Sequence, residues 1–380
     1  MTKFVIVAGE SSGDLLGSKI IASIQDQCPD ATFEGIAGPK MIQAGCKQWF
    51  SSSELSVMGI FGVLKHLPRI LKVRKQLTQK ILKNPPDAFI GIDAPDFNLK
   101  LEKKLKHKGI KTIHVVSPSF WAWRKKRVKV LSQSTDLLLC LFPFEEGILK
   151  EHNVNAVFIG HPLADSIQQK IDFQTAKNNL ELKAKIVVAL MPGSRSSEIN
   201  RHAKLFFEAA KLLTNKIEDI EFVIPVVDSK IGEQLKKILD LYLTDLKVTI
   251  TDSTHSALSV SDLVITKSGT STLEAALHKK PMVVVYKMSS LSYWFLKIFN
   301  IIHTEYIALP NILLGKKLVP ELIQENASSK AIFAESLFWL SNHQKVIELE
   351  QQFDFLHSQL QQNASFLAAT TIVKMLQQKK

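Results

Sequence analysis

Cysteine is scarce in this 380-residue chain, and its three cysteines, Cys28, Cys46 and Cys140, form no C-x-x-C pair. An odd number of isolated cysteines argues against a disulfide framework and is typical of proteins in a reducing compartment. The first strand that we expect begins at Lys3, and no cleavable leader precedes it. These two features predict a cytoplasmic protein whose cysteines are small buried hydrophobes.

Long apolar runs and metal-binding motifs are also missing. The longest apolar candidate, residues 291–302, carries Lys297 and is shorter than the ~20 residues that span a bilayer, so no membrane-spanning helix is expected. The chain has no D-x-D, no H-E-x-x-H and no Cys/His cluster. We therefore expect neither a metal ion nor a cofactor.

Acidic residues are outnumbered, because 48 Lys and Arg face 36 Asp and Glu, for a net charge of +12. Such an excess suits nucleic acid, an anionic membrane or a phosphorylated substrate. Residues 55–86 contain no Asp or Glu at all, and their apolar residues recur at helical spacing. This pattern is typical of a basic amphipathic helix on a membrane surface, although a core helix with a solvated basic face has the same pattern.

Aromatic residues are sparse in this segment, which argues against single-stranded nucleic acid as the partner. We therefore favour the anionic membrane surface and expect no nucleic-acid partner. The residues expected to contact the membrane are Met58, Val63, Leu64, Leu67 and Leu71.

Short apolar runs alternate with helical patterns along most of the chain. Strands are expected at 3–9, 31–38, 87–93, 111–117, 136–142 and 155–160, and then at 185–193, 220–226, 247–251, 262–269 and 281–287. Apolar strands separated by helices predict parallel sheets covered on both faces. The fold class predicted is therefore α/β, with two tandem Rossmann-like doubly wound domains facing a cleft.

The domain limits follow from a polar break after Gly160-His161-Pro162. We expect an N-terminal, membrane-facing domain over 1–165, a nucleotide-binding domain over 166–345 and a helical tail over 346–380.

Two strand-turn-helix segments of the second domain have the features of a nucleotide site. In "ALMPGSRSSEI" (189–199), a Pro-Gly turn brings Arg195 and the backbone N–H groups of a helix start to one place, which suits a pyrophosphate. In "KSGTSTLEAAL" (267–277), Glu274 could accept the two hydroxyls of a ribose. The alternative for Glu274 is a capping box with Ser271.

Two segments of the first domain carry carboxylates after a strand. "VIVAGESSGDLLG" (5–17) matches the hydrolase pattern G-x-S-x-G, but the match lies on the first strand, without the upstream loop that helps to form an oxyanion hole. Glu10 and Asp14 disfavour a phosphate there and can accept hydrogen bonds from sugar hydroxyls. In "FIGIDAPDFNLK" (89–100), Asp93 and Asp96 follow a buried strand, where each can cap a helix or serve as a general base.

Taken together, the motifs of the chain resemble those of the lipid-A-disaccharide synthases, which are family 19 glycosyltransferases. The segments that carry the resemblance are "AGESSGDLLG" (8–17), "SVMGIFGVLKHLP" (56–68), "GIDAPDFNLKLE" (91–102), "VSPSFWAWRKKRV" (116–128), "FPFE" (142–145), "GHPLAD" (160–165), "PGSRSSEI" (192–199), "SGTSTLEA" (268–275), "PMVVVYK" (281–287) and "LPNILLGKKLVPELIQ" (309–324). The chain departs from the expected pattern only at Ala37, Val115 and Phe120, none of them a proposed catalytic carboxylate.

The resemblance implies a GT-B glycosyltransferase of lipid A and lipopolysaccharide biosynthesis in a Gram-negative bacterium. It would join UDP-2,3-diacylglucosamine to 2,3-diacylglucosamine 1-phosphate with inversion, without a cofactor, at the cytosolic face of the inner membrane. It further implies that the domain over 1–165 takes the acceptor, that the domain over 166–345 binds the UDP-sugar, and that the helical tail over 346–380 packs back on the N-terminal domain. A homodimer is expected on the same basis and from the helical tail. The alternatives are another UDP-sugar GT-B enzyme or epimerase, and a nucleotide-binding regulator or nucleic-acid binder.

The resemblance also implies residue roles. Asp96 would be the base on the acceptor 6-hydroxyl, and the sugar and acceptor cleft would contain Glu10, Ser12, Asp93 and Asn311. The residues expected to bind UDP are Gly193, Ser194, Arg195, Ser268, Gly269, Thr270 and Glu274.

Overall fold

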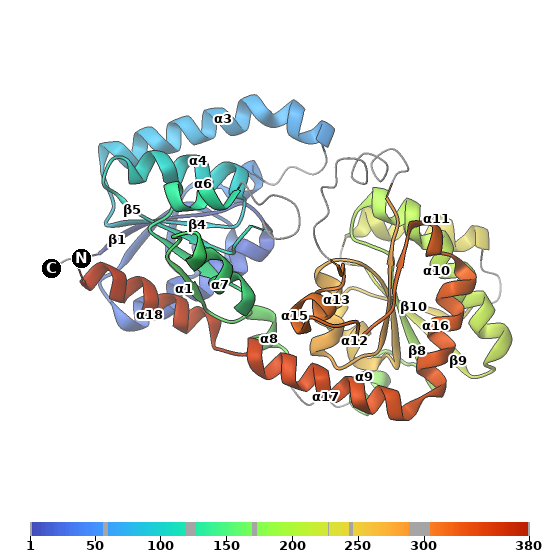
Figure 1. Cartoon of the computed structure of the whole chain (residues 1–380). Coiled ribbons are helices and arrows are strands. Elements are labelled where there is room, and N and C mark those ends of the chain that lie inside the picture. Colours follow the sequence, from blue (N-terminus) through green and yellow to red (C-terminus); the bar gives the residue numbers. More distant parts are fainter. Residues whose placement is uncertain are drawn as a thin grey trace. The chain divides into compact units, whose positions relative to one another are not determined.

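The computed structural model describes residues 2–55, 60–118, 127–168, 173–226, 228–242, 246–288 and 305–378. The chain divides into two compact units (Figure 1). The first unit consists of residues 1–165 and 360–380, and the second consists of residues 166–359. The second unit is thus inserted into the first, which the chain leaves at Asp165 and re-enters at Leu360.

The first unit contains a seven-stranded sheet in the order β3-β2-β1-β4-β5-β6-β7. Every strand pair in it is parallel. Its strands are β1 (Lys3–Ala8), β2 (Thr32–Ala37), β3 (Cys46–Ser51), β4 (Ala88–Ile92), β5 (Lys111–Val115), β6 (Leu137–Cys140) and β7 (Ala156–Phe158). Its helices are α1 (Ser11–Gln27), α2 (Pro39–Gln43), α3 (Ile60–Lys83), α4 (Pro95–Lys106), α6 (Arg127–Ser134), α7 (Pro143–Glu151), α8 (Pro162–Ser166) and α18 (Ala364–Gln377), with the 3₁₀ turn η1 (Ser52–Glu54).

Alternate residues of the central strands point to two separate cores. Phe4 and Ile6 of β1 face one cluster with α1 and α18, and Val5 and Val7 face another with α3 and α4. Figure 1 shows these two helix pairs on opposite sides of the sheet. A sheet covered on both faces explains why its strands are continuously apolar in sequence.

The second unit contains a six-stranded parallel sheet in the order β10-β9-β8-β11-β12-β13. Its strands are β8 (Ile186–Met191), β9 (Ile220–Pro225), β10 (Val248–Thr251), β11 (Leu263–Lys267), β12 (Met282–Tyr286) and β13 (Glu321–Ile323). Its helices are α9 (Phe173–Asn179), α10 (Ser196–Lys216), α11 (Ser229–Tyr242), α12 (Thr254–Val260), α13 (Thr270–Leu277), α15 (Leu309–Leu314), α16 (Ser329–Ser341) and α17 (His343–Leu360), with the 3₁₀ turn η2 (Gln324–Asn326). The predicted fold class, two doubly wound α/β domains, is confirmed.

The two places where the chain crosses between the units are joined by hydrogen bonds inside the first unit. His161 N–H donates to the Leu360 carbonyl at 2.8 Å, and the Asp165 carboxylate accepts from the N–H groups of Asn363 and Ala364 at 2.9 and 2.6 Å. Gly160 has φ +85°, and a Cβ there would meet Gln362 at 2.5 Å, so only glycine fits this junction. Burial lowers the pKa of His161 to about 4, so this imidazole is neutral, and its Nδ1 accepts from Leu163 N–H.

The last helix, α18, completes the core of the first unit. Its Ala364, Ala368 and Ile372 belong to the same buried cluster as Ile20 and Ile24 of α1. The sequence predicts that the tail begins at residue 346, whereas the structure assigns α17 to the second unit, so that the tail enters the first unit only at Leu360. Burial of Phe353 and Leu356 along α17 accounts for this later boundary.

Candidate functional site

The strand order reverses at one position in each sheet, between β1 and β4 in the first and between β8 and β11 in the second. Ligands of doubly wound sheets bind beyond the carboxyl ends of the strands at such a switch point. The loops that leave these four strands are residues 9–10, 93–94, 192–195 and 268–269. They carry most of the site residues that the sequence predicts.

In the second unit, the loop after β8 lies against a glutamate that the sequence analysis did not single out. Gly193 has φ +137°, and a Cβ at this position would meet the Glu198 Cβ at 2.5 Å. Glycine therefore permits both the backbone conformation and the close approach of Glu198. Glu198 lies in the first turn of α10, where the helix dipole favours a negative charge.

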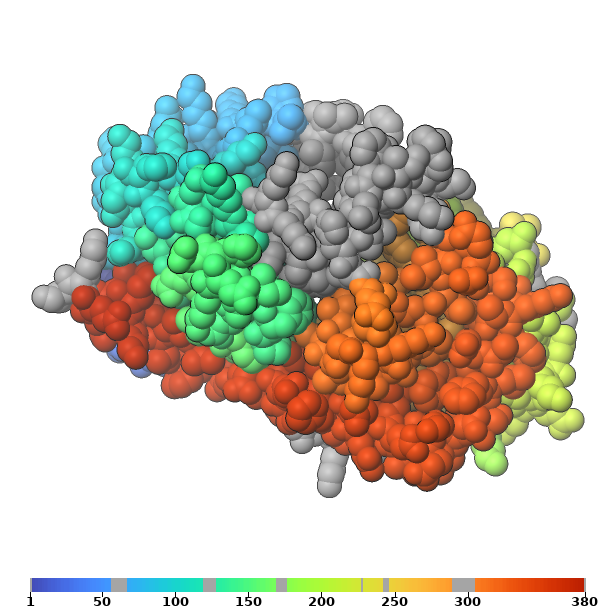
Figure 2. Space-filling view, in the orientation of Figure 1, coloured from blue at the N-terminus to red at the C-terminus, as the bar shows by residue number. Residues whose placement is uncertain are grey.

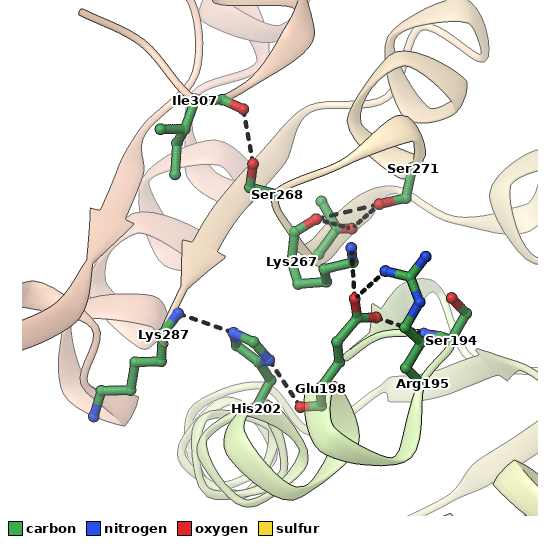
Figure 3. A network of polar contacts seen from close by, with 10 residues as sticks. Ser194, Arg195, Glu198, His202, Lys267, Ser268, Ser271, Lys287 and Ile307 are labelled. Carbon is green, nitrogen blue, oxygen red and sulfur yellow. Dashed lines mark hydrogen bonds and ion pairs between the residues drawn. The ribbon is translucent and has the colours of Figure 1, made fainter. Parts of the chain in front are cut away.

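Three donors from two loops converge on the Glu198 carboxylate (Figure 3). Ser194 N–H donates to Oε2 at 3.0 Å, while the Lys267 Nζ and the Arg195 Nη1 lie 3.2 and 3.3 Å from Oε1. Burial alone raises the pKa of Glu198, but the Lys267 ammonium, the Ser194 N–H and the Arg195 guanidinium together hold that pKa below its usual range. The loops thus form an anion-binding centre, and in this structure a carboxylate of the chain itself occupies it.

The loop after β11 approaches the same centre. Gly269 has φ +153°, and a Cβ there would come within 2.9 Å of the Lys267 Nζ. The Ser268 hydroxyl donates to the Ile307 carbonyl at 2.7 Å (Figure 3), so this side chain ties down the loop, while Thr270 is exposed at the start of α13. The hydroxyl proton of Ser268 is therefore used within the chain, and only its oxygen can still accept a hydrogen bond.

A cavity of about 220 Å³ opens at this end of the second sheet. It is lined by Met191, Gly193, Ser194, Pro225, Val226, Asp228, Ile231, Thr254, Lys267, Thr270, Ser271 and Glu274. The cavity joins the anion-binding centre to apolar side chains, a combination that fits the diphosphate and the less polar parts of a nucleotide.

Glu274 lies in this cavity, and the structure decides between its two predicted roles. Helix α13 begins at Thr270 with Gly269 as its N-cap, and Ser271 Oγ bonds the Lys267 carbonyl at 3.2 Å, so Ser271 and Glu274 do not form a capping box. Among the described residues, no side chain or backbone group donates to the Glu274 carboxylate, and burial raises its pKa. Its carboxylate is therefore available to a ligand.

In the first unit, the turn after β4 holds Asp93 in a strained conformation and leads into the helix that carries Asp96. Asp93 and Ala94 have φ of +50° and +44°, which is unfavourable for residues with a side chain. The Asn98 Nδ2 donates to the Asp93 carbonyl at 2.8 Å, and Asp93 N–H donates to the Val115 carbonyl at 2.8 Å. Asp96 follows in the first turn of α4 with an exposed side chain.

The two carboxylates that follow β1, those of Glu10 and Asp14, differ in exposure. Glu10 is the exposed N-cap of α1, and Ser12 is exposed in its first turn. Asp14 is buried, and its carboxylate accepts from the N–H groups of Gly38, Lys40 and Met41 at 2.9, 3.0 and 3.0 Å. The interpretation of Asp14 as part of a sugar-facing surface is wrong, because its oxygens cap α2.

The prediction that Asn311 lies in the sugar and acceptor cleft is also wrong. It is fully buried in α15, where its Oδ1 accepts from Leu318 and Val319 N–H at 2.8 and 3.0 Å. Its Nδ2 donates to the Val319 carbonyl and to Glu321 Oε1 at 3.0 and 2.9 Å. Since these bonds use both ends of the amide, Asn311 holds the segment before β13 in place and does not face a cleft.

The residues predicted to contact a membrane lie on or near α3. Met58 is outside the described residues, as are the side chains of Val63 and Leu64. Leu67 and Leu71 are 40% and 42% exposed. The same helix buries Val73, Leu77 and Ile81 in the core, so it combines a packed face with an exposed apolar one.

Sequence reasoning missed Glu198 and Lys267, although a signal was present for each. Glu198 stands three residues after Arg195, where acids commonly stabilise a first helical turn, and Lys267 is the last residue of an apolar strand. Over the described ranges, no group of three or more His, Cys, Asp or Glu side chains is arranged to hold a metal ion. No helix in the described part of the chain is long and apolar enough to cross a membrane.

Known proteins resemble this chain over its whole length. The profile of the family described as lipid-A-disaccharide synthetase matches residues 4–375. A lipid-A-disaccharide synthase from Methylobacillus flagellatus is 43% identical over 376 residues, covering 98% of each chain. Another from Xanthomonas campestris pv. campestris is 41% identical over 386 residues, covering 99% of this chain and 87% of the relative.

Solved structures share the fold at low sequence identity. UDP-GlcNAc 2-epimerase from Neisseria meningitidis, bound to UDP-GlcNAc, has a TM-score of 0.66 and 13% identity, covering 99% of this chain and 100% of that one. MurG from Acinetobacter baumannii has a TM-score of 0.57 and 13% identity, covering 100% of both chains. These neighbours support the two-domain fold.

Proposed function

The chain belongs to the lipid-A-disaccharide synthetase family and is a glycosyltransferase of lipid A biosynthesis, and from this membership we propose the roles of its two switch points. As a glycosyltransferase, it takes a nucleotide-sugar donor and an acceptor. The proposed donor is UDP-2,3-diacylglucosamine and the proposed acceptor is 2,3-diacylglucosamine 1-phosphate. Membership in this family sets aside an epimerase and a nucleic-acid binder.

The observation that carries the assignment of the donor site is the convergence of Ser194 N–H, Arg195 and Lys267 on one carboxylate. A diphosphate presents the same acceptor chemistry with more negative charge, so the diphosphate of UDP takes the place of the Glu198 carboxylate. Glu274, in the same cavity, accepts the ribose hydroxyls. Gly193 and Gly269 let the backbone approach the phosphates closely.

The proposed reaction is a single displacement. The acceptor 6-hydroxyl attacks the anomeric carbon of the donor while its proton passes to the Asp96 carboxylate. The bond from that carbon to the UDP oxygen breaks, and the configuration inverts from α to β. Arg195 and Lys267 stabilise the charge that develops on the departing diphosphate.

The proposal that Asp96 is the base is supported by its exposure in the first turn of α4, directly after a turn at the carboxyl end of β4 that hydrogen bonds fix. Glu10, Ser12 and Asp93 supply further acceptors and donors for sugar hydroxyls at the same switch point. Asn311 is not included, because both ends of its amide are bound by backbone groups and by the Glu321 carboxylate.

The experiment measures UDP release by the purified chain in detergent, with each substrate omitted in turn and with or without EDTA. Release that requires both lipids supports the proposed substrates. Release that EDTA does not change supports a reaction in which Arg195 and Lys267 provide the positive charge. Release from the donor without the acceptor contradicts the proposal.

The proposed location is the cytosolic surface of the inner membrane, with α3 in contact with anionic lipid. Leu67 and Leu71 are exposed on a helix whose neighbouring side chains include Arg69, Lys72 and Lys75. Leu67→Ser with Leu71→Ser should weaken binding to phosphatidylglycerol-containing vesicles by about tenfold, because two apolar side chains leave the lipid.

The matched control replaces two exposed leucines of other helices, Leu15→Ser with Leu241→Ser. Sedimentation with vesicles measures both variants. Equal binding by the two variants would return α3 to the alternative interpretation, a core helix with a solvated basic face.

A further inference from the structure

A groove of about 310 Å³ lies between α3 and α4 in the first unit. It is lined by Leu71, Arg74, Lys75 and Thr78 of α3 and by Lys100, Leu101 and Lys104 of α4. The two helices lie side by side on the same face of the sheet, and their surfaces adjoin in the space-filling view (Figures 1 and 2). The sequence pattern indicates a basic surface on α3 alone, and the structure adds the basic residues of α4 to it.

The groove carries four positive charges and no acidic lining residue. Lys75, Lys100 and Lys104 are exposed, and within the described residues none of them forms an ion pair or a hydrogen bond through its ammonium group. Like charges gathered without counter-charges repel one another, and a bound anion removes this cost. The chemistry that fits is a phosphate group.

The proposed catalytic base, Asp96, belongs to the same helix as two of the lining lysines. Asp96, Lys100 and Lys104 are four residues apart along α4 and therefore lie on one face of it, at ~5–6 Å between successive Cβ atoms. The Arg74 Nη1 approaches the Asp96 carbonyl at 3.5 Å from α3. A phosphate held by Arg74 and Lys100 would thus lie about one helical turn from the Asp96 carboxylate.

We propose that the groove between α3 and α4 binds the 1-phosphate of the lipid acceptor and so orients the acceptor 6-hydroxyl toward Asp96. This inference rests on the proposed function. The carbons that carry the phosphate and the 6-hydroxymethyl group, C1 and C5, both adjoin the ring oxygen of the acceptor sugar, so fixing the phosphate limits which hydroxyl can reach the base. Leu71, 42% exposed at the groove, offers apolar contact to the acyl chains.

The test compares Lys100→Ala/Lys104→Ala with the matched control Lys83→Ala/Lys108→Ala. The control removes two exposed lysines that do not line the groove, the last residue of α3 and a residue just after α4. Each protein is assayed for UDP release in neutral detergent micelles at saturating donor, with the acceptor and with 2,3-diacylglucosamine that lacks the phosphate. Loss of two charge-assisted contacts should reduce the preference for the phosphorylated acceptor by about 10- to 100-fold.

In the groove variant, the KM for the donor and the rate with the phosphate-free acceptor should stay as in the wild type. The control should keep the full preference for phosphate. Thermal unfolding checks that both variants fold, and the single substitution Lys104→Gln gives a milder form of the same test.

An unchanged preference in the groove variant, in an enzyme whose wild type needs the acceptor, overturns the groove and leaves the proposed function standing. Weaker vesicle binding with an unchanged preference also overturns it and assigns the groove to bulk lipid headgroups. Absence of acceptor-dependent release in the wild type overturns both proposals together.

Discussion

The switch points of the two sheets share one topology and carry opposite chemistry. In each sheet the strand order reverses between the first strand and the fourth, and helices begin directly after both strands. The first unit places Glu10, Asp93 and Asp96 there, while the second places Arg195 and Lys267. Strand order therefore fixes where a ligand can bind, and under the proposed function the few loop residues decide whether a hydroxyl or a diphosphate is bound.

The two switch points are also held in different ways. In the first unit, hydrogen bonds from Asn98 and to Val115 fix a turn with two residues at positive φ, a strain of roughly 1–3 kcal/mol for each residue. In the second, ionic contacts between Glu198, Lys267 and Arg195 join the two loops. A base needs a fixed position, whereas a diphosphate site needs charges that can change partner.

The largest effect is expected from removing the proposed base of the first unit, the Asp96 carboxylate. Asp96→Asn should lower the rate of UDP release by roughly 10²–10⁴-fold, the usual contribution of a general base, while UDP affinity stays unchanged. The control is Asp26→Asn, an exposed aspartate of α1. Near-normal turnover would move the base to Asp93 or Glu10.

The next effect is expected from the positive charge of the second unit. Lys267→Met should weaken UDP binding by about 10- to 100-fold, because a charge-assisted contact with the diphosphate is lost. Calorimetry measures the affinity of each variant for UDP and for uridine, and the affinity for uridine should not change. The control is Lys247→Met, an exposed lysine just before β10. An equal loss for uridine would mean that Lys267 shapes the whole cavity and does not bind phosphate.

A smaller effect is expected for Glu274→Gln, about tenfold weaker UDP binding and no change for 2′,3′-dideoxy-UDP. Burial raises the pKa of Glu274, so its carboxylate takes up a proton at a higher pH than an exposed glutamate does. Wild-type affinity for UDP should consequently fall as the pH drops through this raised pKa, and Glu274→Gln should abolish that fall. Equal losses of affinity for UDP and for 2′,3′-dideoxy-UDP would show that Glu274 does not bind the ribose hydroxyls.

The smallest effect is expected for Glu198→Gln, which should bind UDP about three- to fivefold more tightly. The neutral side chain still accepts from Ser194 N–H but competes less with the diphosphate for Lys267 and Arg195. The control is Glu208→Gln, another ion-paired glutamate of α10. Weaker UDP binding would show that Glu198 holds the loops in place and is not a competitor of the ligand.

The sequence predicts the central strands of both sheets because buried parallel strands are continuously apolar. It misses β3, whose Lys47 and Gln48 are exposed, and β13, which has only three residues. Each of these strands lies at an edge of its sheet and has a neighbouring strand on one side only, so its residues need not all be apolar.

Site residues could be predicted where their position directly after a strand indicates their role. Arg195 and Asp96 belong to loops after strands, and both are exposed at a switch point. Asp14 and Asn311 have side chains that suit sugars, but backbone N–H groups 24 residues away for Asp14 and seven residues away for Asn311 use their oxygens. The partner of Glu198, Lys267, is likewise 69 residues away, a pairing that no local pattern contains.

The insertion of the second unit into the first has a consequence for synthesis on the ribosome. Helix α1 is translated near the start, yet the apolar face formed by Ile20, Ile21 and Ile24 is covered by α18, the last helix made. At ~5–20 residues per second, the N-terminal sheet waits on the order of tens of seconds for that cover. The second unit, continuous in sequence, can fold during this interval. A chain that ends before residue 360 therefore leaves the apolar face of α1 uncovered and the first unit prone to aggregation.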